Sequence, residues 1–124
     1  MNNYKNLKEK PVYDLEERTF NFAKNIRIFV KSLPNTITNI EDSKQLIRSS
    51  GSIGANYREA NEALSKKDFM VRLKISRKEA KESKYWLRLI KESNNIKNGK
   101  NEKLIQEAEE LKRIFSSIIE KSKR

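Results

Sequence analysis

Residues 49–60 read Ser-Ser-Gly-Ser-Ile-Gly-Ala-Asn-Tyr-Arg-Glu-Ala, a run of mostly small side chains between two segments with helical patterns. Gly51 and Gly54 would each cost about 1 kcal/mol relative to alanine inside a helix, which favours a loop. Apolar and small residues nevertheless continue through the run at alternating steps of three and four, as they do on a helix. We therefore predict one long helix whose small side chains let neighbouring helices approach closely. Its structural motif consists of Gly54, Asn56, Tyr57 and Glu59.

The two glycines do not fit a nucleotide-binding loop. A phosphate-binding P-loop requires a Gly-Lys-Ser/Thr ending, and none follows Gly54. The spacing of Gly51 and Gly54 matches the Gly-x-x-Gly loop of one RNA-binding module, but that module needs strands, which this sequence does not predict. Helix packing is the interpretation that remains.

The composition indicates a single all-α domain. The chain has 124 residues, three glycines, two prolines and 36% charged residues, a combination typical of long amphipathic helices. It has no cysteine and no histidine, so we predict no catalytic residue, no cofactor and no metal site, and no enzymatic activity. Neither a signal peptide nor a membrane-spanning run is recognisable, so we expect a cytoplasmic protein without membrane attachment.

The hydrophobic pattern predicts four helices in a domain of residues 13–124, after a flexible arm of residues 1–12. Asp14 and Glu17 resemble a capping box at the start of the first helix, and Pro34 ends its pattern. For the second helix, which ends near residue 64, Thr38 and Glu41 form the candidate capping box.

The third helix is predicted to follow the cap residue Ser65 and to run to about Asn94, a length of ~43 Å. After a linker over residues 94–100, a fourth helix extends to the C-terminal tail. Four helices with short connections predict an antiparallel up-and-down four-helix bundle.

Positive charge is concentrated on the third helix. The net charge of the chain is +11, and residues 65–94 carry ten Lys or Arg and four Asp or Glu, a net charge of +6. Six cations form an unbroken line on one side of this helix: Lys74, Arg77, Lys81, Lys84, Arg88 and Lys91. Such a line is either solvated or follows a phosphate backbone without reading sequence. Tyr85 and Trp86 lie near the line, but so few aromatic residues do not predict base stacking.

The opposite side of the third helix mixes apolar and acidic side chains. Its predicted interface residues are Ile75, Glu79, Glu82, Trp86 and Leu89. A solvated face would rarely hold these apolar residues together, so we predict an oligomer interface; alternatively, these residues cover the edge of the bundle itself. Carboxylate pairs such as Glu59 with Glu62 and Glu79 with Glu82 could hold a metal ion, but bundles of that kind rely on Glu-x-x-His, and this sequence has no histidine. We therefore predict that Glu59, Glu79 and Glu82 pair with basic groups or bind between helices.

Four motifs resemble a known family. They are Ser-Ile-Gly-Ala-Asn-Tyr-Arg-Glu-Ala from Ser52, Ser-Lys-Lys-Asp-Phe from Ser65, Lys-Glu-Ala-Lys-Glu from Lys78 and Tyr-Trp-Leu-Arg-Leu from Tyr85. Together they resemble the four-helix bundle proteins named for intervening sequences of bacterial 23S rRNA genes. The resemblance implies an up-and-down bundle that assembles as a homopentameric ring. Its relatives include accessory proteins of diversity-generating retroelements, which bind a reverse transcriptase and nucleic acid.

Together these features predict a non-enzymatic basic bundle that self-associates and binds RNA or other nucleic acid. A second hypothesis is a protein-binding adaptor for a nucleic-acid enzyme such as a reverse transcriptase, in which the basic face meets acidic protein. A third hypothesis, attachment to an anionic membrane, requires an exposed apolar face beside the basic one.

Overall fold

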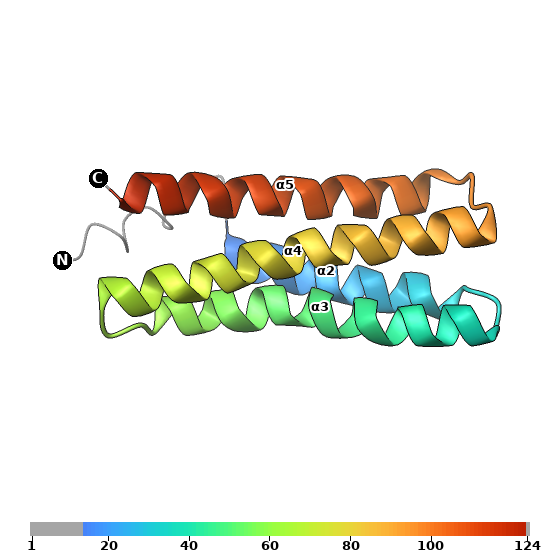
Figure 1. Cartoon of the computed structure of the whole chain (residues 1–124), viewed down its shortest axis with the longest axis horizontal. Coiled ribbons are helices and arrows are strands. Elements are labelled where there is room, and N and C mark those ends of the chain that lie inside the picture. Colours follow the sequence, from blue (N-terminus) through green and yellow to red (C-terminus); the bar gives the residue numbers. More distant parts are fainter. Residues whose placement is uncertain (1–13, 124) are drawn as a thin grey trace.

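The computed structural model describes residues 14–123, which form four helices joined by short connections (Figure 1). The helices are α2 (Leu15–Lys31), α3 (Ile37–Asn61), α4 (Lys66–Asn94) and α5 (Gly99–Ser122). Successive helices run in opposite directions; α3 packs against α2 and α4, and α5 packs mainly against α4. The described residues contain no strand, so the predicted all-α fold with four helices is confirmed. The predicted arm of residues 1–12 lies outside the described residues.

Two of the predicted helix caps are confirmed. The Asp14 carboxylate accepts a hydrogen bond from the backbone N–H of Glu17 at 3.2 Å. The Ser65 hydroxyl accepts one from the backbone N–H of Asp68 at 3.0 Å. Each side chain thereby satisfies an N–H group that has no partner within its own helix.

The predicted cap of α3 is wrong by two residues. Thr36, not Thr38, precedes the helix, and its hydroxyl accepts a hydrogen bond from the backbone N–H of Asn39 at 3.2 Å. The backbone of Thr36 is extended, with φ −100° and ψ 162°, as an N-cap requires. The spacing of Thr38 and Glu41 matched a capping box, but Thr38 already lies within the first turn.

The core is built from the helix faces that the sequence pattern predicts. Every residue of the predicted α4 core face is buried: Phe69, Leu73, Ser76, Ala80, Ser83, Leu87 and Ile90. Phe22 and Phe29 of α2 and Phe115 of α5 are also buried. Burial of a large apolar side chain contributes about 1.5–3 kcal/mol, so these faces account for the association of the helices.

The small-residue stretch is helical throughout, so the loop interpretation of its glycines is wrong. Gly54 lies where α3 meets α2, and a Cβ atom added there would be 2.8 Å from Oγ1 and 3.2 Å from Cβ of Thr19. The Thr19 hydroxyl donates to the Leu15 carbonyl at 2.6 Å, which holds it in this position. The missing side chain of Gly54 thus permits the close helix approach that the sequence predicted.

Two asparagines close one end of the contact between α3 and α4. Nδ2 of Asn39 donates to Oδ1 of Asn94 at 2.8 Å, and Nδ2 of Asn94 donates to Oδ1 of Asn39 at 2.7 Å. The same two amides also donate to the carbonyl groups of Pro34 and Ile90. Asn95 then ends α4 in the left-handed conformation, with φ 57°, as residues at helix C-termini commonly do.

Candidate nucleic-acid interface

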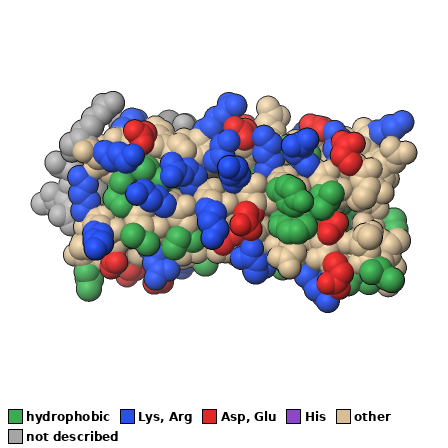
Figure 2. Space-filling model, viewed as in Figure 1, with side chains coloured by type: hydrophobic (Ala, Val, Ile, Leu, Met, Phe, Trp, Pro, Cys, Tyr) green, Lys and Arg blue, Asp and Glu red, His purple; other side chains and the backbone are tan. Residues whose placement is uncertain are grey.

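The basic line of α4 divides into two groups according to exposure. Lys74, Lys81 and Arg88 are exposed, whereas Arg77, Lys84 and Lys91 are half-buried. The two groups alternate because positions three and four residues apart lie on slightly different sides of the helix. Figure 2 shows Lys and Arg side chains spread over α4 and α5 on this face of the molecule.

Both half-buried lysines of the line bind carboxylates of α5. Nζ of Lys84 lies 3.0 Å from Oε1 of Glu109, and Lys91 pairs with Glu102. Two hydrogen bonds, one from Lys84 with the larger effect and one from Lys112 with the smaller, lower the pKa of Glu109 to about 2. These two members of the predicted line therefore connect α4 to α5, in addition to any contact with a ligand.

The other four members of the line have no carboxylate partner among residues 14–123. Lys74, Arg77, Lys81 and Arg88 take part in none of the ion pairs between described residues. Lys78, which the sequence analysis did not include, is also exposed and without such a pair, and it lies on the outer side of the same line. The available basic surface is thus centred on the outward side of α4.

The mixed face of α4 is partly occupied by α3. Arg48 of α3 lies between two predicted interface carboxylates, 3.4 Å from Glu79 and 3.2 Å from Glu82. This confirms the prediction that Glu79 and Glu82 pair with a basic group, although Arg48 was not predicted as the partner. The same prediction is wrong for Glu59, which is exposed and takes part in no ion pair among the described residues. Glu79 is buried, and its second oxygen, Oε1, has no hydrogen-bond partner within the described structure.

The apolar members of the mixed face remain partly accessible. Ile75 and Trp86 are half-buried, and Trp86 packs against the core; Leu89 is 38% exposed. The neighbouring Tyr85 is 58% exposed and makes an edge-on contact with Trp86. A group of hydrophobic side chains is visible over α4 in Figure 2.

The structural motif of α3 is separate from the basic line. Asn56 accepts a hydrogen bond from Arg72 of α4 at 3.0 Å, and its Nδ2 donates to the Ser52 carbonyl at 2.9 Å. Tyr57 is buried beside Phe115, with ring centroids 5.8 Å apart, and Glu59 is exposed. Except for Glu59, the motif serves helix packing.

Burial raises the pKa of Tyr57 to about 12, although a hydrogen bond with Asn61 acts in the opposite direction. The hydroxyl therefore stays protonated at neutral pH. Its role is that of a core side chain with a polar end.

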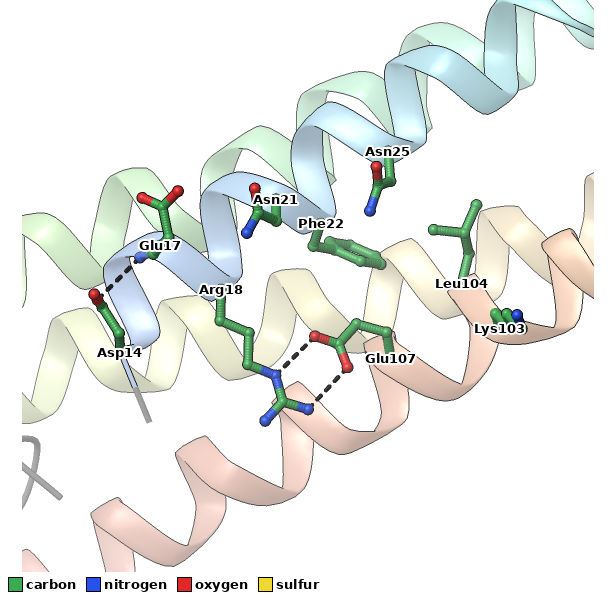
Figure 3. Close-up of a pocket in the computed structure, with 9 residues that line it drawn as sticks. All are labelled: Asp14, Glu17, Arg18, Asn21, Phe22, Asn25, Lys103, Leu104 and Glu107. Carbon is green, nitrogen blue, oxygen red and sulfur yellow. Dashed lines mark hydrogen bonds and ion pairs between the residues drawn. The ribbon is translucent and has the colours of Figure 1, made fainter. Parts of the chain in front are cut away.

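A groove of about 540 Å³ separates α2 from α5 (Figure 3). Nε and Nη2 of Arg18 each lie 2.8 Å from an oxygen of Glu107 across it, and Glu110 lies 3.1 Å from the same guanidinium. The hydrogen bond with Glu107 raises the pKa of Arg18. Asn21 and Asn25 also line the groove. The helix pattern does not predict this groove, because the groove depends on which helices are neighbours.

In the part of the chain that the structure describes, no three Asp or Glu residues are grouped so that they could hold a metal ion. None of the helices described has an apolar stretch that would cross a bilayer.

The comparisons with known proteins agree with the fold. Residues 13–117 match the model of the 23S rRNA-intervening sequence protein family. The crystal structure of a protein with unknown function from the S23 ribosomal protein family of Bacteroides thetaiotaomicron superimposes with a TM-score of 0.77. Its sequence is 38% identical, and the match covers 84% of this chain and 96% of that one. No curated protein sequence matches significantly. The chain therefore belongs to the 23S rRNA-intervening sequence protein family.

Proposed function

We propose that this protein is a non-enzymatic, cytoplasmic helical bundle that self-associates and binds RNA or other nucleic acid through the outward side of α4. The observation that carries the proposal is the row of unpaired cations Lys74, Lys81 and Arg88, each exposed and seven residues from the next. Seven residues are two helical turns, so the three charges lie on one line ~21 Å long. A line of cations of this kind suits a phosphate backbone.

The cations of the row differ from those that are neutralised within the fold. A glutamate lies within 4.0 Å of nine described cations: Arg18, Lys44, Arg48, Arg58, Lys84, Lys91, Lys112, Arg113 and Lys123. Other exposed cations, such as Lys24, Lys31 and Lys121, also have no ion pair among the described residues, so the row on α4 is distinguished by the alignment of three such cations on one helix face. Among the described residues, Lys84 and Lys91 are the cations of α4 that pair with carboxylates of α5, and the row remains available for an external anion.

Binding to RNA and DNA oligonucleotides at several salt concentrations tests the proposal. If these side chains neutralise phosphates, the affinity falls with salt, with a log-log slope of about −0.7 per contact on single strands, and shows little dependence on sequence. The triple variant Lys74→Glu, Lys81→Glu, Arg88→Glu should lose binding. Absence of binding by the wild type at low salt would contradict the proposal.

A charge-matched control separates the row from net charge. Lys24, Lys31 and Lys121 are exposed on other helices and have no ion pair among the described residues. Changing these three lysines to glutamate alters the net charge by the same amount and should weaken binding much less. Equal losses in both triple variants would mean that only the net charge acts.

The self-association that we propose uses the mixed face of α4 and produces a closed ring. The family resemblance implies a ring of five subunits. The partly exposed Trp86 and Leu89, next to Tyr85, support it, because they form an apolar group on an otherwise charged helix. Light scattering measures the mass, and Trp86→Glu should dissociate the assembly with helicity retained. A monomer mass for the wild type at tens of micromolar would contradict this part of the proposal.

The same apolar group supports a second candidate function, an adaptor for a nucleic-acid enzyme such as a reverse transcriptase. In that case the exposed Tyr85 and Leu89 contact the enzyme while the neighbouring cations meet acidic side chains. Binding to a purified polymerase, without binding to oligonucleotides, would favour this function.

A further inference from the structure

Tyr85 is an exposed aromatic residue at the border between the basic line and the mixed face of α4. Its side chain is 58% exposed, and its ring centroid lies 5.0 Å from that of Trp86 with an interplanar angle of 81°. Trp86 in turn packs against the core. The edge-on contact therefore limits the movement of the Tyr85 ring while more than half of its surface stays open to solvent.

The free cations flank this ring. Lys81 precedes Tyr85 by four residues and Arg88 follows it by three, so all three side chains lie on the same side of α4. Lys81 and Arg88 are ~10.5 Å apart along the helix axis, and neither has a carboxylate partner within residues 14–123. The arrangement is an exposed aromatic ring with an exposed positive charge on each side.

Resting on the proposed function, we infer that Tyr85 stacks with an unpaired base, and that the ligand of this surface is single-stranded nucleic acid. A duplex presents its phosphates to Lys81 and Arg88, but its bases are stacked inside and cannot cover the ring. A single strand satisfies both features at once, because its bases are free to stack while its backbone follows the cations. The small number of aromatic residues does not by itself predict base stacking. The positions of Lys81 and Arg88 on either side of Tyr85 do, because they place backbone contacts next to the ring.

The test compares a 15-nucleotide oligouridylate with an RNA duplex of the same length, using the full chain. Trp86 is the only tryptophan, so its fluorescence reports binding next to Tyr85. The wild type should bind the single strand more tightly, with a change in Trp86 emission. Tyr85→Ala should weaken binding of the single strand by roughly tenfold, and Tyr85→Phe should retain affinity because the ring is kept.

The salt dependence distinguishes stacking from charge. Tyr85→Ala should lower the affinity extrapolated to 1 M salt and leave the log-log slope unchanged, whereas Lys81→Glu should reduce the slope. Phe20 of α2, which is 60% exposed, provides the matched control, and Phe20→Ala should bind as the wild type does.

Two outcomes would overturn the inference and leave the proposed function intact. One is equal affinity for the duplex and the single strand, and the other is wild-type affinity of Tyr85→Ala for the single strand. Loss of the assembly in Tyr85→Ala, measured by light scattering, would also overturn it, because reduced avidity would then explain the weaker binding. Absence of any binding by the wild type overturns both the inference and the proposed function.

Discussion

Helix α2 meets its two neighbours in different ways. Against α3, the absence of a side chain at Gly54 allows an approach so close that a Cβ atom would lie 2.8 Å from the Thr19 hydroxyl. Against α5, an open groove remains, and Arg18 spans it to reach Glu107. One contact thus depends on shape and the other on charge, so substitutions and solution conditions should affect them differently.

The largest effect is expected at the contact that depends on shape. Gly54→Leu should reduce the free energy of unfolding by about 1–3 kcal/mol, because the added side chain must displace Thr19 and its helix. Urea denaturation monitored by circular dichroism measures the change. Gly54→Ala should also lower the free energy of unfolding. The double variant Gly54→Ala, Thr19→Ala should recover part of that loss, because the threonine hydroxyl that the new Cβ atom would meet is removed. Unchanged stability of Gly54→Leu would show that α2 and α3 are not closely packed there.

A smaller effect is expected at the contact that depends on charge. Arg18→Gln should cost about 1 kcal/mol, since both partners are roughly one quarter exposed and the pair is bidentate. This loss of unfolding free energy should become smaller as salt is added, whereas the loss caused by Gly54→Leu should not depend on salt. Arg58→Gln is the control, because Arg58 and Glu16 form a longer and more exposed pair at 3.6 Å. If Arg18→Gln were insensitive to salt, packing of the arginine stem would account for its effect.

An effect that depends on pH is expected from the acidic titration of Glu109, in the contact between α4 and α5. Its pKa is about 2 in the folded protein, below the ordinary value of 4.5, so its stabilising contribution is complete above pH 4.5 and is lost as the pH falls toward 2. The difference in the free energy of unfolding between the wild type and Glu109→Gln should therefore diminish over this interval. Glu41→Gln, which removes an exposed carboxylate paired with Lys44, should differ little from the wild type. A difference that stays constant from pH 5 to pH 2.5 would contradict the assignment.

The comparison also shows which features could be predicted from the sequence. Burial of Phe69 and Leu87 follows from the spacing along one helix, and the caps Asp14 and Ser65 follow from local hydrogen bonding, so periodicity and capping rules found them. These features need no knowledge of neighbouring helices. The close position of Gly54 was predicted for the same reason, since small side chains at helical spacing already indicate a packed face.

Contacts between helices were harder to predict. Lys81 and Lys84 belong to the same line in the sequence, but only Lys84 faces Glu109, and the side on which α5 packs cannot be read from α4 alone. The bridges from Arg18 to Glu107 and from Arg48 to Glu79 were missed because each joins residues distant in sequence. The pattern thus identified the basic surface but could not separate its free cations from those used within the fold.

The reciprocal amide pair of Asn39 and Asn94 has a consequence for the alignment of α3 and α4. Many residues along this contact are small, so apolar packing alone would penalise a sliding movement only weakly. A shift by one turn, ~5.4 Å, would separate the two amides and leave their donors and acceptors unmatched, at about 1–3 kcal/mol for each group that stays buried. The pair therefore fixes the register of α3 and α4 together with two buried hydrogen bonds, between Ser49 and Ser83 and from Ser76 to the Ile53 carbonyl. That register also determines the height of the exposed cations of α4 relative to the small-residue face of α3.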